Sequence, residues 1–91
     1  MSQWSVVGAS SDADTYFCKH LVSRMEKAEE GATSTFTNML EIDFMKFLAD
    51  KRLSSGGGYF THKELYAVER NGEIVGDLMA LIAIANAEFG M

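Results

Sequence analysis

The thiol and imidazole side chains are the first candidates for nucleophilic, acid–base or zinc chemistry near neutral pH, and this sequence has three of them: Cys18, His20 and His62. Cys18 and His20 are two residues apart, so on a helix they point in nearly opposite directions and cannot exchange a proton. Two histidines and one cysteine without metal-ligand spacing argue against zinc. Cys18 lies on an apolar stripe, where we expect a buried, unreactive thiol. The sequence therefore predicts no catalytic residue, no metal site and no cofactor, and indicates that the protein is not an enzyme.

A run of three glycines in Arg52–Leu65, RLSSGGGYFTHKEL, is the second place where chemistry is conceivable. Backbone amides of Gly56–Gly58 could face an anion or a small ligand. However, the residue order of a phosphate-binding loop is missing, and no strand signal precedes the run. We favour a flexible connector. Tyr59 and Phe60 follow it, either as exposed aromatic anchors for a partner or as a plug at one end of the core.

Gly58 to Leu65, GYFTHKEL, resembles the second half of an EF-hand calcium loop, with Glu64 six residues after the glycine. The resemblance covers only these eight residues and implies a helical regulatory module. The positions that would supply the other oxygen ligands hold Leu53, Ser55 and Gly57. Calcium requires six to eight oxygens, so the alternative that this resemblance supports is a degenerate module without calcium binding.

Size and composition narrow the function classes further. The 91 residues suit one domain spanning 1–91, with 47% hydrophobic residues and no proline. A net charge of -5 repels nucleic acid, so direct DNA or RNA binding is not expected. The N-terminal residues lack the features of a signal peptide, and the longest apolar run, Leu78 to Ala85, is too short to span a membrane. We expect a cytoplasmic protein.

Hydrophobic periodicity predicts an all-α domain of four helices, with a short extended segment around Trp4 to Val7 before them. The expected helices cover residues 12–30, 38–53, 61–71 and 77–89. The second helix has a broad apolar arc, and only a narrow line through Asp43, Lys46 and Asp50 is polar. Such a helix is either central to the core or covered on a second side by a partner.

The third helix has an alternative. Thr61 and Glu64 fit a capping box, which favours a helix. The sequence VERNGEIVG is also a hairpin signal, with Asn-Gly at the turn and Arg70 opposite Glu73. The alternative fold is therefore an α+β domain with a hairpin at 65–76. The last helix, capped by Asp77, is apolar almost all round, which is typical of a buried centre or of half a homodimer interface.

These patterns favour a small acidic module or inhibitor that binds a partner protein, one with a basic surface or a second copy of the chain. In size and acidity the chain is similar to the small inhibitors that bacteriophages make against host defences. The candidate partner-binding residues are Trp4, Tyr59, Phe60, Asp43 and Asp50.

Overall fold

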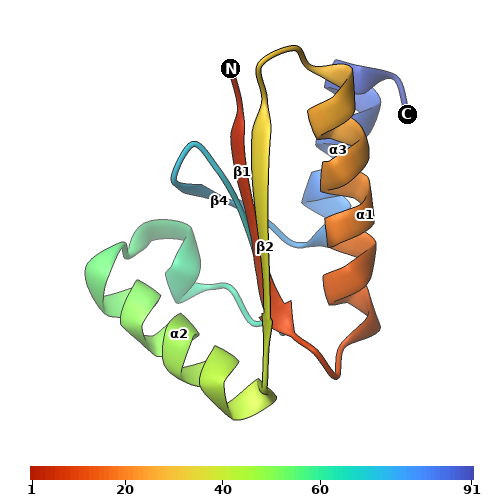
Figure 1. The fold of residues 1–91 in the computed structure, drawn as a ribbon. Coiled ribbons are helices and arrows are strands. Elements are labelled where there is room, and N and C mark those ends of the chain that lie inside the picture. The colour runs from red at the N-terminus through yellow and green to blue at the C-terminus, as the bar shows by residue number, and fades with distance from the viewer.

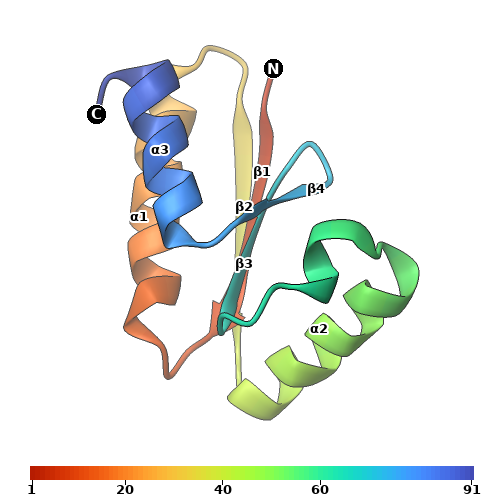
Figure 2. The ribbon, with the colours of Figure 1, turned by 180° about the vertical axis from the view of Figure 1, so that it is seen from behind.

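The chain folds around a four-stranded mixed sheet with the strand order β2-β1-β3-β4 (Figure 1). The computed structural model describes all 91 residues. Helices α1 and α3 cover one face of the sheet, and α2 lies on the other face (Figures 1 and 2). Along the chain the elements are β1 (Gln3–Ala9), α1 (Ala13–Ala28), β2 (Thr33–Met39), α2 (Glu41–Ser54), the short 3-10 helix η1 (Gly57–Phe60), β3 (Tyr66–Arg70), β4 (Glu73–Gly76) and α3 (Leu78–Phe89).

Strand β1 is the centre of the sheet. It pairs in parallel with β2, where Val6 is opposite Phe36, and antiparallel with β3, where Val6 is opposite Val68. Alternate residues of β1 enter opposite layers: Trp4 and Val6 belong to the core under α1 and α3, whereas Val7 packs on the α2 side. This alternation is the period of a strand buried on both faces.

The sheet separates two hydrophobic clusters of unequal size. The larger one, between the sheet and helices α1 and α3, consists of Trp4, Val6, Cys18, Leu21, Val22, Met25, Tyr66, Val68, Leu81 and Ala85. The smaller one, under α2 and η1, consists of Ala9, Phe44, Leu48, Tyr59 and Ala67. Helix α2 is thus held by a small cluster of its own.

The prediction of an all-α helical bundle is wrong: the domain is α+β. Residues 61–71 form no helix, and the hairpin at 65–76, which was the alternative, is what the chain forms through β3 and β4. Asn71 and Gly72 have φ values of 55° and 85°. Positive φ at both turn residues gives the twist that a two-residue hairpin needs, and Arg70 is opposite Glu73 as the hairpin reading requires.

A second correction concerns residues 33–39, which form β2 and not a connector. Asn38 is a strand residue and caps no helix, because α2 begins at Glu41 after Leu40, whose side chain makes no capping bond. The first and last helices are confirmed. Asp12 accepts a hydrogen bond from the Asp14 amide at 3.0 Å, and Asp77 accepts one from the Ala80 amide at 2.9 Å. No helix combines the length and the apolar character that crossing a membrane would require.

Candidate functional site

The side of α2 that faces away from the sheet is apolar and open to solvent. Ile42, Met45 and Leu53 are 65%, 49% and 89% exposed. With the exposed Ala49 they recur at i, i+3, i+7 and i+11, the spacing of a single helix face. Phe44 and Leu48 point the other way and are fully buried. We call the exposed set the α2 stripe: Ile42, Met45, Ala49 and Leu53.

A row of charged residues runs beside the α2 stripe. Asp43, Lys46 and Asp50 follow the same i, i+3, i+7 spacing and are all exposed. Phe60, in η1 just beyond the end of α2, is 67% exposed. Three of the five sequence-predicted partner residues, Phe60 and the two aspartates, therefore lie on the surface of the α2 layer.

The other two predicted residues, Trp4 and Tyr59, are each only 2% exposed. Trp4 is buried in the larger cluster, and the Arg70 guanidinium covers its ring at 4.9 Å. Tyr59 closes the smaller cluster under α2. Neither side chain offers surface to a partner.

A polar network fixes the orientation of α2. The Tyr59 hydroxyl donates to Glu69 of β3, and Lys51 of α2 lies 3.1 Å from the same carboxylate. Burial, with the bond to Glu69, raises the pKa of Tyr59, so the hydroxyl keeps its donor proton. Arg52 adds two bonds to backbone oxygens, from Nε to Tyr59 at 3.1 Å and from Nη2 to His62 at 2.8 Å. The α2 stripe therefore stands on an anchored helix.

Only part of this surface was visible to sequence reasoning. The broad apolar arc indicated that α2 could have two apolar sides, but it did not say which side the sheet would cover. The network of Lys51, Tyr59 and Glu69 joins three separate elements, so no spacing along the chain could reveal it. No family model matches the chain, and a comparison with curated proteins finds none that is similar.

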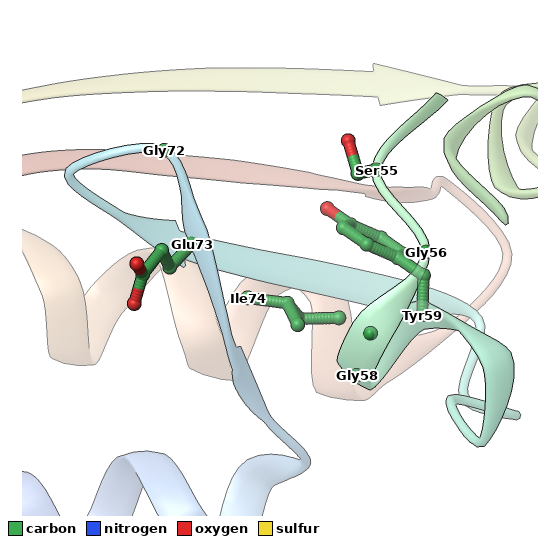
Figure 3. Close-up of a pocket in the computed structure, with 8 residues that line it drawn as sticks. Ser55, Gly56, Gly58, Tyr59, Gly72, Glu73 and Ile74 are labelled. Carbon is green, nitrogen blue, oxygen red and sulfur yellow. The ribbon is translucent and has the colours of Figure 1, made fainter. Parts of the chain in front are cut away.

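The glycine run lines a pocket of about 290 Å³ (Figure 3). Its walls are Ser55, Gly56, Gly57, Gly58, Tyr59, Gly72, Glu73 and Ile74. The lining includes no cationic side chain, and the Glu73 carboxylate points away from the glycines. A Cβ on Gly58 would lie 2.6 Å from Ile74 Cγ2, so this glycine lets η1 pack closely on β4. Anion binding at this pocket stays a prediction that the lining does not favour.

The residues singled out for chemistry are not assembled into a site. Cys18 is fully buried, and its burial raises the pKa of the thiol to about 12. His20 is exposed on α1, whereas His62 is buried and its Nε2 contacts the Tyr66 carbonyl. Glu64 precedes strand β3 and opens no helix, so the resemblance to an EF-hand does not extend to its helix pair. No group of three potential metal ligands lies together.

Proposed function

We propose that the protein is a cytoplasmic, non-catalytic interaction module that inserts the α2 stripe into an apolar groove of a partner protein. The observation that carries the proposal is the exposure of Ile42, Met45 and Leu53 on one face of an anchored helix. Large apolar side chains gathered on one surface are typical of protein-binding sites. Anchors at i, i+3 and i+7 are the pattern by which a helix binds in a groove.

The charge beside the stripe specifies the rim of that groove. Asp43 and Asp50 flank a single cation, Lys46, and the whole chain carries a net charge of -5. Basic residues on the partner would be attracted to this rim and would accelerate association. A second copy docked through its own α2 stripe would bring its Asp43 and Asp50 to the same rim, so we assign the α2 stripe to a different protein with a basic rim.

Preorganisation also supports this mode of binding. Phe44 and Leu48 hold α2 on the sheet from one side, and the Lys51–Glu69 contact holds its C-terminal half. The binding helix is therefore formed before the partner arrives. Binding then costs little backbone ordering, which is the main penalty for segments that fold only on association.

Site-specific photo-crosslinking tests the proposal in the source cells. A crosslinker replaces Met45 in one variant and Met79 in the control, because Met79 is also an exposed methionine, 69% accessible, but lies on α3. We expect position 45 to capture one partner protein through a groove lined by apolar residues with lysine or arginine at its rim. Equal capture at positions 45 and 79 would remove the case for the α2 stripe.

Titration calorimetry with the purified partner then measures the contribution of the stripe. Leu53→Asp should raise the Kd at least tenfold, equivalent to about 1.4 kcal/mol, whereas Met79→Asp should leave it unchanged. Asp43→Asn should slow association at low salt and lose this effect at high salt, because a rim charge acts mainly on the association rate. A Kd that is the same for Leu53→Asp and for the unmodified protein would refute the proposal.

A further inference from the structure

Strand β2 forms one edge of the sheet, and nothing pairs with its outer side (Figure 1, where β2 is the strand nearest the viewer). Its sequence, TSTFTNM, has no charge, no proline and no glycine, and its seven residues pair with β1 in an unbroken register. Proteins usually protect such an edge with a lysine, a proline, a bulge or a very short strand. The opposite edge has such protection, because β4 has only four residues and a register shift interrupts its pairing with β3. Strand β2 is therefore the unprotected edge.

Two hydrogen bonds fix which backbone groups of β2 face outward. The Thr33 amide donates to the Ser2 carbonyl at 3.0 Å, and the Met39 carbonyl accepts from the Ser10 amide at 2.8 Å. At both ends of β2, the backbone groups of the odd-numbered residues therefore point toward β1. Because successive residues of a strand direct their backbone groups to opposite sides, the outward N–H and C=O groups belong to the even-numbered residues, Ser34, Phe36 and Asn38.

We propose that β2 pairs antiparallel with β2 of a second copy, about a two-fold axis at Phe36. In this register Phe36 is opposite the partner's Phe36, and Ser34 is opposite the partner's Asn38. The residues at these positions are the ones whose backbone groups face outward, so each pair exchanges two hydrogen bonds. The two sheets become one continuous sheet, with α1 and α3 of both copies on the same face.

The side chains of β2 are complementary to themselves in this register. On the α2 face of the sheet, the exposed Thr35 is opposite the partner's Thr37, and threonine pairs across strands are favourable. On the α1 face the two Phe36 rings meet as an aromatic pair. Strand β2 itself carries no charge. Lys19 of α1 lies 4.8 Å from the centre of the Phe36 ring, so the two-fold axis brings it toward the partner's Lys19, and this repulsion opposes the pairing at low salt.

Helix α1 extends the match beyond the strand. Near one end of β2, the Glu26 carboxylate accepts a hydrogen bond from the Ser34 hydroxyl at 2.7 Å. Near the other end, the Tyr16 hydroxyl accepts the Asn38 amide at 3.2 Å and keeps its own proton to donate. Ser34 is opposite the partner's Asn38 in this register. The two-fold axis therefore places the Glu26 carboxylate, a hydrogen-bond acceptor, at the same level as the partner's Tyr16 hydroxyl, a donor. This pair on the flanking helices adds to the match between the two strands.

Paired substitutions at two exposed threonines test the register. In Thr35→Lys/Thr37→Lys each lysine at 35 is opposite the partner's lysine at 37, whereas in Thr35→Lys/Thr37→Glu each pair becomes opposite in charge. Light scattering and sedimentation should give twice 10.0 kDa for the unmodified protein at high concentration. The double-lysine variant should dissociate at least tenfold more readily, and the lysine–glutamate variant should regain the dimer. Circular dichroism checks that both variants are folded.

Two results would overturn the proposal: a monomer at every concentration from about 10 μM to about 1 mM, or a dimer that the double-lysine variant leaves intact. Amide hydrogen exchange gives a measurement that needs no variant. The Ser34, Phe36 and Asn38 amides should become protected as the concentration rises, while the amide of Thr35, already bonded to β1, should not change. Equal concentration dependence at all four amides would also count against the proposed edge. Substitutions in the α2 stripe should leave the dimer unchanged, so this result is separable from the partner proposed above.

Discussion

Replacing Phe44 with alanine should loosen the α2 layer. Phe44 is fully buried in a cluster of only five residues, and its ring also stacks on Phe47 at 5.8 Å. A buried Phe→Ala change costs about 3–5 kcal/mol of the free energy of unfolding. At roughly 0.05–0.15 kcal/mol per residue, a chain of this length has about 5–14 kcal/mol in total. Phe44→Ala should therefore fold but lose a large share of its stability.

Urea denaturation measures the global loss, and native-state hydrogen exchange shows where it falls. The α2 amides can open without disturbing the larger cluster under α1 and α3, so they should begin with less protection than those of β1 and α1. If Phe44→Ala lowers the free energy of opening of every element by the same amount, the α2 amides lose their protection first, because they have the least at the start. Ile42→Ala is the matched control, because Ile42 lies on the same helix but is 65% exposed, and it should cost less than about 0.5 kcal/mol. A loss below about 1 kcal/mol for Phe44→Ala, or α2 amides as protected as those of β1, would refute the reasoning.

Three other outcomes can be measured on the isolated protein. The Glu29 carboxylate accepts bonds from the Ser2 hydroxyl at 2.8 Å and the Ser2 amide at 2.7 Å, which lower its pKa below 4.5. The stabilisation by this carboxylate is therefore present above pH 4.5 and is lost as the pH falls through the lowered pKa. In Glu29→Gln, the urea midpoint should fall less steeply as the pH is lowered. An unchanged pH dependence in this variant would exclude Glu29 as a cause. Cys18 should react with a thiol reagent only as fast as the protein unfolds, and rapid labelling of the native state would contradict its burial. Gly72→Ala should cost about 1–2 kcal/mol in urea denaturation because φ is 85° there, and a neutral effect would argue against the turn geometry.

Elements stabilised by neighbouring residues could be predicted from the sequence. The helices α1 and α3 begin at Asp12 and Asp77, whose side chains bond to amides within the first turn, and each carries its apolar pattern within its own length. The hairpin was also encoded locally in Asn71-Gly72, but a capping-box pattern at Thr61 competed with it. Non-local pairing of β3 with β1 resolves that competition in favour of the strand.

Strand β2 could not be predicted because its pattern is nearly all polar. Phe36 and Met39 are its only large apolar residues, the others being threonine, serine and asparagine. Its partner β1 lies 30 positions earlier in the register Val6 to Phe36. In the candidate site, too, local features could be predicted and contacts between distant residues could not. The apolar arc of α2 was readable, whereas the burial of Trp4 under Arg70 depends on a contact between residues far apart in the chain.

The central place of β1 has a consequence for synthesis of the protein. Its backbone is hydrogen-bonded to β2 on one side and to β3 on the other, and the Asn71 amide bonds to the Gln3 carbonyl at 2.8 Å. A nascent chain that has released only its first half from the ribosome holds a two-stranded parallel ribbon with one bare side. The sheet closes only after Arg70 has left the exit tunnel, so until then the side of β1 that pairs with β3 has no backbone partner, and folding of the sheet waits for this long-range contact.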